Sequence, residues 1–249
     1  MNFENSIISN LNKNLYLLAI IFILPISLYA QDKTGSDVDQ GLKLYGSGNY
    51  AEARELFESA LKKDPTSNDI RYYLANTELA LTNYKEAIKM YSVILSTDKT
   101  NTNALFNRGN AYYETEDYKK TIKDMGTLIG IDPNHADAFS LRGSACFQLD
   151  LFDAALNDFS SAINLDSTNA DHYYDRGNTY FMLENYSAAI QDYTNAIRIN
   201  DKKADYYFNR ALSEFYLQMN SSGCSDLEKA AALGDKDAKS YINEFCNDF

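Results

Sequence analysis

The sequence has no tryptophan and only three prolines, three cysteines and two histidines in 249 residues. The two histidines, His135 and His172, stand apart from any cysteine or histidine at zinc-ligand spacing, so we expect both on the surface. The sequence also lacks an HExxH pair, a nucleophile elbow and a glycine-rich phosphate loop. These absences predict a protein that is not an enzyme and that uses no metal and no cofactor.

Positive charge is scarce as well. The chain has 23 lysines and arginines against 35 aspartates and glutamates, which gives a net charge of -12. An acidic surface repels the phosphate backbone, so nucleic acid is not an expected partner. Apolar residues make up 45% of the chain, which is enough to build a core and argues against wholesale disorder.

One long apolar run, Leu15–Leu24, lies near the N-terminus. Lys13 precedes it and Ala30 follows it, which is the order of charged, apolar and small residues in a secretory signal peptide. We therefore predict a signal peptide at 1–30 and export to the periplasm, cell envelope or extracellular space, with no transmembrane segment left after cleavage. The alternative is a retained anchor, although 15–30 is shorter than the roughly twenty residues that span a bilayer.

Internal repetition dominates the rest of the chain. Arginines recur every 34 residues, each inside a block such as Asn107–Tyr113, and a period of this size is typical of stacked repeat units. The arginines are Arg108, Arg142, Arg176 and Arg210. A column of tiny residues in the same register holds Gly41, Ala75, Gly109, Gly143, Gly177 and Ala211. A column of large residues holds Phe57, Tyr91, Met125, Phe159, Tyr193 and Leu227.

Within a unit the columns have helical spacing. Ala87, Tyr91 and Ile94 lie at i, i+4 and i+7, which is the stripe that an amphipathic helix buries. Junction residues tolerate a left-handed turn conformation, so they can end one helix and begin the next. They are Asn49, Asn83, Asp117 and Asn185. Each unit is therefore predicted to be two antiparallel helices, with a tiny residue where the facing aromatic enters the crossing.

These columns resemble the tetratricopeptide repeat, whose unit is a helix–turn–helix of 34 residues. In one unit the family pattern stands as Gly177, Tyr180, Ala189, Tyr193 and Ala196. The resemblance implies an all-α, right-handed α-solenoid in residues 37–237, after a flexible lead-in at 31–36. The implied units are about 34–67, 68–101, 102–135, 136–169, 170–203 and 204–237, followed by a capping helix at 238–249.

The resemblance also implies a binding surface, because first helices of successive tetratricopeptide units line a concave groove. A protein or peptide would bind there, held by asparagine amides and aromatic anchors. The implied groove residues are Tyr72, Asn76, Phe106, Asn110, Tyr113, Phe147, Tyr174, Asn178, Phe181, Phe208 and Phe215. The alternative is that the aromatics only pack between adjacent first helices. The groove lacks the lysines of the family's clamp for C-terminal carboxylates, which disfavours that type of partner.

Cysteines and arginines receive structural interpretations. Cys224 and Cys246 fall in the last unit and the cap, and an oxidising compartment would let them form a disulfide; two buried thiols are the alternative. Cys146 replaces tyrosines of its column and is predicted to be a small buried residue. The periodic arginines are expected to pair with acids of neighbouring units, such as Asp137 or Asp171, rather than to form a ladder for anions.

The predicted function is a non-enzymatic interaction scaffold or adaptor, exported to the cell envelope, that binds a protein segment in the concave groove. Two alternatives stay open at this point. One is a structural subunit of an envelope complex that uses its convex face, and the other is an accessory to glycan or peptide handling. Fold alone does not choose among them, and it does not indicate the oligomeric state.

Overall fold

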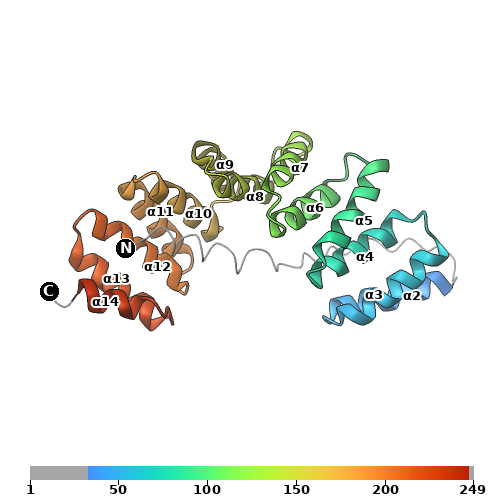
Figure 1. Cartoon of the computed structure of the whole chain (residues 1–249), viewed down its shortest axis with the longest axis horizontal. Helices are drawn as coiled ribbons and strands as arrows, with labels where there is room; N and C mark the ends of the chain where they lie inside the picture. The colour runs from blue at the N-terminus through green and yellow to red at the C-terminus, as the bar shows by residue number, and fades with distance from the viewer. Residues whose placement is uncertain (1–32, 247–249) are drawn as a thin grey trace. The chain divides into compact units, whose positions relative to one another are not determined.

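The computed structural model describes residues 33–246, and every regular element in that range is an α-helix (Figure 1). Consecutive helices pack against each other as pairs, and each pair packs on the next within a compact unit. The pairs are α2 Lys33–Gly46 with α3 Tyr50–Lys63, α4 Asn68–Ala80 with α5 Tyr84–Thr97, α6 Thr102–Glu114 with α7 Tyr118–Ile131, α8 Ala136–Gln148 with α9 Phe152–Leu165, α10 Ala170–Met182 with α11 Tyr186–Ile199, and α12 Ala204–Tyr216 with α13 Asn220–Ala232. Helix α14, Ala238–Phe245, packs on α13. The prediction of an all-α solenoid of helical repeats is confirmed.

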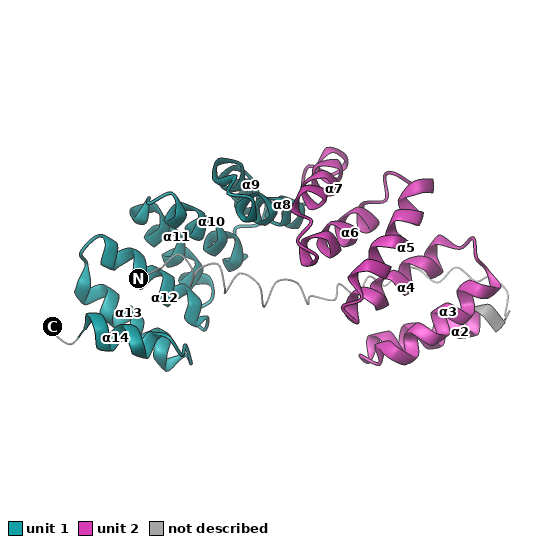
Figure 2. Cartoon of the chain, in the orientation of Figure 1, with its two compact units in different colours: residues 1–20, 135–249 teal, residues 21–134 magenta. Residues whose placement is uncertain are grey.

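The helices fall into two compact units, which Figure 2 shows in different colours. The N-terminal unit comprises the described residues up to Asn134, and the C-terminal unit begins at His135. The division follows α7, the helix that contains Gly126 and Gly130. Each internal glycine lowers helix stability by about 1 kcal/mol relative to alanine. The two units are described separately below.

The start of α2 corrects one expectation. Residues 33–36, which the sequence analysis assigns to a flexible lead-in, form the first turn of this helix. Gly35 lies there, and a first turn needs no intrahelical partner for its backbone N–H groups, so glycine is tolerated. The predicted signal peptide at 1–30 lies outside the described residues. Across residues 33–246, no helix has the length and the apolar content needed to cross a bilayer.

The tiny and large columns meet inside each helix pair. A methyl group added at Gly177 would lie 2.8 Å from the Tyr193 ring, and one at Gly41 would lie 2.7 Å from the Phe57 ring. These glycines are therefore required for close helix approach rather than for flexibility. Phe57, Tyr91, Met125, Phe159, Tyr193 and Leu227, the large column, are at most 1% exposed. They form the centre of the two cores.

The turn inside each pair differs from the expectation by one residue. The left-handed conformation falls on Gly48, Thr82, Glu116, Asp150, Glu184 and Gln218. The asparagines and Asp117 that follow are instead the first caps of the second helices, with φ near −85°. The Asp117 and Asn185 side chains accept hydrogen bonds from backbone N–H groups of the next turn, which satisfies groups that a helix start leaves unpaired.

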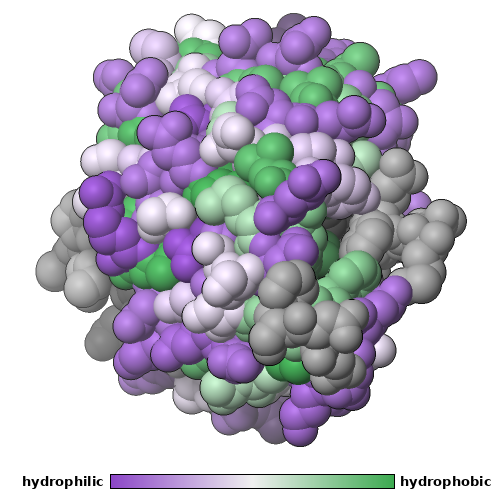
Figure 3. Space-filling view, turned by 90° about the vertical axis from the view of Figure 1, so that its left-hand side faces the viewer, coloured by the Kyte–Doolittle hydropathy of each residue, from purple (hydrophilic) through white to green (hydrophobic). Residues whose placement is uncertain are grey.

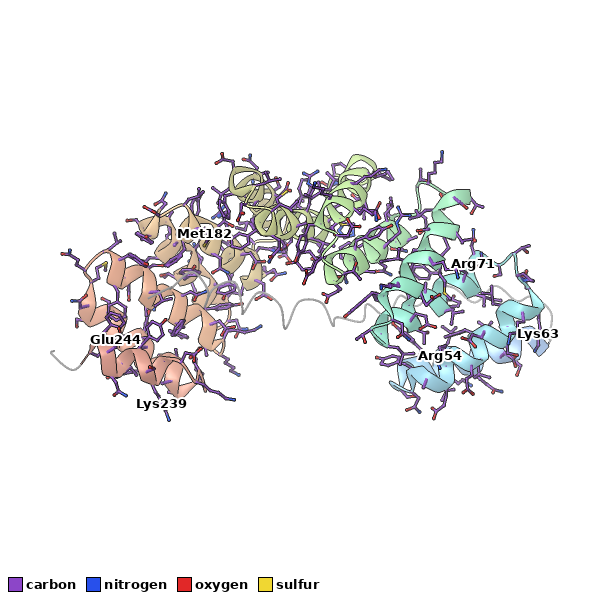
Figure 4. The ribbon with its side chains drawn as sticks, viewed as in Figure 1. Arg54, Lys63, Arg71, Met182, Lys239 and Glu244 are labelled. Carbon is purple, nitrogen blue, oxygen red and sulfur yellow. A yellow bond between two sulfur atoms is a disulfide. The ribbon has the colours of Figure 1, made fainter. Side chains whose placement is uncertain are left out.

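Helix α14 closes the last pair with aromatic contacts. The rings of Tyr241 and Phe208 lie 5.1 Å apart, and those of Phe245 and Phe215 lie 5.3 Å apart. Lys239 and Glu244, on the other side of the helix, are exposed (Figure 4). The Cys224 and Cys246 sulfur atoms lie at bonding distance, 2.03 Å, in this contact. Cys146 is a free, buried cysteine, as predicted.

Candidate functional site

The first helices of the N-terminal unit share a network of asparagine and tyrosine side chains. The Asn76 carbonyl oxygen on α4 accepts a hydrogen bond from the Tyr91 hydroxyl at 2.5 Å and from the Asn107 amide at 2.9 Å. The same Asn107 amide donates to the Tyr72 hydroxyl at 3.2 Å. The network therefore links α4, α5 and α6 and fixes which way the Asn76 amide points.

The C-terminal unit contains the same network three repeats further along the chain. The Asn178 carbonyl oxygen accepts from the Tyr193 hydroxyl at 2.8 Å and from the Asn209 amide at 3.1 Å. Asn209 also donates to the Tyr174 hydroxyl at 2.9 Å. We call these two sets the N-terminal quartet (Tyr72, Asn76, Tyr91, Asn107) and the C-terminal quartet (Tyr174, Asn178, Tyr193, Asn209).

The two quartets differ in what covers them. Tyr206 of α12 packs on Tyr174 with 4.9 Å between ring centres, and its hydroxyl donates to the Asp171 carboxylate. The corresponding residue in the N-terminal unit is Ala104, which has no ring to place over Tyr72. As a result all of the C-terminal quartet is buried, whereas Tyr72, Asn76 and Asn107 are half-buried.

This burial divides the predicted groove residues into two sets. Buried side chains, which are not presented to a ligand, are Tyr113, Phe147, Tyr174, Asn178, Phe181 and Phe208. Half-buried side chains are Tyr72, Asn76, Phe106, Asn110 and Phe215. For the first set the packing alternative describes the structure, because their rings fill the space between helices: Phe181, for example, lies edge-on to both Tyr186 and Tyr216.

The half-buried set lies mostly on two adjacent helices. Tyr72 and Asn76 belong to α4, Phe106 and Asn110 belong to α6, and these two helices are in contact. Phe215 lies apart from them, on α12, against the α14 ring of Phe245. We call the surface of Tyr72, Asn76, Phe106 and Asn110 the N-terminal first-helix face. No other described residue hydrogen-bonds to the Asn110 side chain.

Helix α10 carries buried polar groups that sequence reasoning missed. His172 is 1% exposed rather than at the surface, and neither ring nitrogen has a partner among the described residues. Burial lowers the pKa of His172, while the nearby Asp137, Asp166 and Asp171 act in the opposite direction. Burial also raises the pKa of Asp175 well above its usual range. The column position of His172, shared with Ala104 and Ala138, was the signal that pointed inward.

The periodic arginines are structural, as expected, but their partners are not those proposed. Arg176 binds Asp192 of the same helix pair through two parallel hydrogen bonds of 2.7 and 2.8 Å. Arg108, Arg142 and Arg210 pair in the same way with Asp124, Asp158 and Asp226. Asp137 and Asp171 are wrong because the acid sixteen residues later, on the facing second helix, lies directly opposite each guanidinium. These groups are therefore satisfied internally and do not form an anion ladder.

The described residues contain no group of three or more His, Cys, Asp or Glu side chains that could hold a metal ion. The chemistry that the N-terminal first-helix face offers is hydrogen bonding by amides and contact with aromatic rings. Both are properties of a surface that binds another chain.

Comparisons with known proteins agree with this architecture. Sequence profiles described as tetratricopeptide repeat match residues 44–105, 170–203 and 15–67, and one described as TPR repeat matches 143–184. A profile described as anaphase-promoting complex, cyclosome, subunit 3 matches residues 82–162. No curated protein matches the chain.

Solved structures show the same fold. The crystal structure of MamA is 25% identical, covers 67% of this chain and 97% of its own, and has a TM-score of 0.62. PilF of Pseudomonas aeruginosa is 19% identical over 85% of this chain and 97% of its own, with a TM-score of 0.71. YrrB is 17% identical over 76% and 97%, with a TM-score of 0.63. From its repeat columns, its paired helices and these matches, the chain belongs to the tetratricopeptide repeat family.

Proposed function

We propose that this protein is a non-enzymatic interaction scaffold that binds an extended protein segment on the N-terminal first-helix face. The observation that carries the proposal is Asn110. Its amide is half-buried and unpaired within the described chain, so it can donate to and accept from a peptide backbone without breaking an existing bond. An amide in this state gains more from a ligand than one that is already satisfied.

The residues around Asn110 provide apolar anchors. Phe106 lies one helical turn before it on α6, and Tyr72 lies on the adjacent α4; both are half-buried. A half-buried ring keeps a fixed position while leaving part of its surface for contact, and such rings are frequent at binding hot spots. YrrB, a solved structure with this fold, is described as a TPR protein with an unusual peptide-binding site. This description supports the class of ligand that we propose.

The binding proposal is tested by selecting peptides from a displayed random library on immobilised protein and measuring the affinity of synthetic copies. We expect Asn110→Ala and Phe106→Ala to weaken binding about tenfold each, the effect of losing roughly 1.4 kcal/mol. Val93→Ser, an exposed apolar residue on the second helix α5, serves as the matched control and should leave affinity unchanged. Equal affinities for wild type and both face variants would remove the proposal.

We also propose export to the cell envelope, on the basis of the signal-peptide pattern at residues 1–30. Expression of the full chain in a bacterial host, followed by cell fractionation and N-terminal sequencing, is expected to give a product that begins at Gln31. Retention of the full-length chain in the membrane fraction would favour the anchor alternative.

The pairing of Cys224 and Cys246 in an oxidising compartment follows from the same proposal. Alkylation of the exported protein with and without prior reduction, read by mass spectrometry, is expected to block only Cys146 before reduction. Labelling of all three cysteines in unreduced, unfolded protein would contradict a disulfide.

A further inference from the structure

The turns between first and second helices in the C-terminal unit expose large apolar side chains. Leu183 is 41% exposed, Leu217 is 40%, Met219 is 44% and Tyr216 is 45%. Leu151, on the preceding turn of the same unit, is 50% exposed. We call these five residues the C-terminal turn patch. Figure 3, which views the molecule from the side of the C-terminal unit, shows apolar surface between hydrophilic surfaces.

Aromatic stacking joins two of these turns into one surface. The Tyr216 ring, at the end of α12, stacks on the Tyr186 ring at the start of α11, with centres 4.4 Å apart and planes 5° from parallel. Leu183 lies in the turn that leads to Tyr186, directly after Met182, which Figure 4 labels. Leu217 and Met219 continue from Tyr216. The turn of one helix pair thus lies against the turn of the next.

The repeat supplies its own control for this surface. The positions of Tyr216, Leu217 and Met219 are occupied in the third helix pair by Glu114, Thr115 and Asp117. The fold therefore forms the same turn without apolar residues. None of the exposed large apolar residues of the N-terminal unit, Leu42, Val93 and Ile131, lies in such a turn.

Two patch residues replace a better local choice. Leu151 and Met219 stand at the first cap of α9 and α13 and make no capping hydrogen bond, whereas Asp117 and Asn185 make one at the same position. An apolar cap leaves a backbone N–H group without this partner, so it weakens the helix start. Where a sequence gives up a local preference and gains no buried contact, function is the expected reason.

The charge around the patch has one sign. Asp150 and Glu184 lie within its turns and are exposed. No lysine or arginine occurs in residues 143–175, 177–197 or 211–228, which contain all three turns. The corresponding turns of the N-terminal unit are followed by Lys85, Lys119 and Lys120. An apolar surface bordered by carboxylates fits a partner that is apolar and cationic.

We propose that the C-terminal turn patch is a docking surface for an amphipathic helix of another protein, with an apolar stripe flanked by lysine and arginine. The stripe contacts Leu183, Leu217 and Met219, and its basic residues lie beside Glu184 and Asp150. This surface is separate from the N-terminal first-helix face, so it adds a second binding function to the scaffold. Exposed apolar patches of this kind mark contact sites in soluble proteins.

The test uses a synthetic amphipathic helix of about 16 leucines and lysines, long enough for an apolar stripe of four turns. Binding to the full chain is measured by fluorescence anisotropy of the labelled peptide. The triple variant Leu183→Ser/Leu217→Ser/Met219→Ser is expected to bind at least about tenfold more weakly. Leu42→Ser/Val93→Ser, which removes equally exposed apolar residues from the other unit, should bind as wild type. Circular dichroism confirms that each variant is folded.

Further arms separate this site from its alternatives. Glu184→Lys is expected to weaken binding, and a peptide with glutamate in place of lysine should not bind. Asn110→Ala should have no effect, so failure of the groove proposal and failure of this one are distinguishable. The proposal is overturned if the triple variant binds equally, or if a scrambled peptide of equal charge binds equally. It is also overturned if patch substitutions instead dissociate a dimer in sedimentation, or abolish binding to neutral phosphatidylcholine vesicles, because the occupant would then be a second copy or a lipid surface.

Discussion

The N-terminal and C-terminal quartets have the same side chains, the same hydrogen-bond pattern and different exposure. Asn76 and Asn178 both accept from a tyrosine hydroxyl and from the asparagine of the next first helix. What differs is one column position: Ala104 in one unit and Tyr206 in the other. The larger ring covers Tyr174 and leaves the C-terminal quartet as core, whereas the N-terminal quartet stays at the surface. A single large residue thus decides whether a polar network stabilises the fold or faces a ligand.

The largest expected effect is that of Tyr206→Ala, which uncovers the C-terminal quartet. Loss of this buried ring should lower the free energy of unfolding by about 3–4 kcal/mol, the usual range for removing a core aromatic. Urea unfolding followed by circular dichroism measures it. Tyr206→Phe, which keeps the ring and loses the bond to Asp171, is the control and should cost about 1 kcal/mol. Equal losses for both variants would show that the hydroxyl, not the ring, is decisive.

Removing the bridging asparagine should separate the two quartets further. In Asn209→Leu the buried Tyr174 hydroxyl and Asn178 oxygen each lose a donor, at a cost of about 2–3 kcal/mol. In Asn107→Leu the half-buried Tyr72 and Asn76 can turn to water, so about 1 kcal/mol is expected. The measurement is again the free energy of unfolding. If both substitutions cost the same, exposure does not distinguish the quartets.

Glycine-to-alanine substitution compares the packing beside each unit's large column. In Gly177→Ala the new methyl meets the rigid Tyr193 ring, so we expect a loss of about 1–2 kcal/mol. In Gly109→Ala it meets the terminal methyl of Met125, which can move away, and the helix gains about 1 kcal/mol of propensity. Thermal unfolding should therefore show a lower midpoint for the first variant and an unchanged or higher one for the second. The reverse order would contradict this account of the tiny column.

The smallest effect concerns Glu78 and Glu214, which share a column. The Glu78 carboxylate accepts a hydrogen bond from Asn83, whereas Met219 replaces that asparagine and one oxygen of Glu214 is left without a partner in the described chain. Burial raises the pKa of Glu214 from 4.5 to about 7, with Asp226 adding to the rise and Arg210 opposing it. The folded state therefore favours the protonated form, so stability is full below about pH 4.5 and falls as pH rises through 7.

The substitution Met219→Asn restores the missing donor. It should lower the pKa of Glu214 and reduce the fall in stability between pH 5 and about 8, as measured by urea unfolding at a series of pH values. Glu214→Gln should remove this contribution altogether and is the control. An unchanged pH profile in both variants would exclude Glu214 as its origin.

Several features were accessible from the repeat alone. Aligned columns predicted the paired helices, the glycines beside Phe57 and Tyr193, and the cap with Tyr241 and Phe245 facing inward. They succeeded because a helix pair buries the same positions in every unit, so each column averages six versions of one local environment. The pattern also predicted that the arginines are structural, since their period is that of the fold.

Other features required the packed structure. The left-handed residue is Thr82 rather than Asn83, because the chain must reverse before the second helix is capped. Arg176 pairs with Asp192 because the second helix of its own pair lies nearer than the neighbouring unit. His172 was assigned to the surface from its polarity, although its column points inward. Each error came from judging a residue by its type when its position decided the outcome.

By itself, the sequence determined that this chain repeats a 34-residue helix pair, because the spacing of small and large residues specifies which faces must be buried. Only the tertiary structure decided which asparagines and aromatics remain accessible. Exposure depends on the side chain that the next helix places over them, as Tyr206 covers Tyr174 and Ala104 leaves Tyr72 open. The column alignment contains both residues, but their effect exists only when neighbouring helices are stacked.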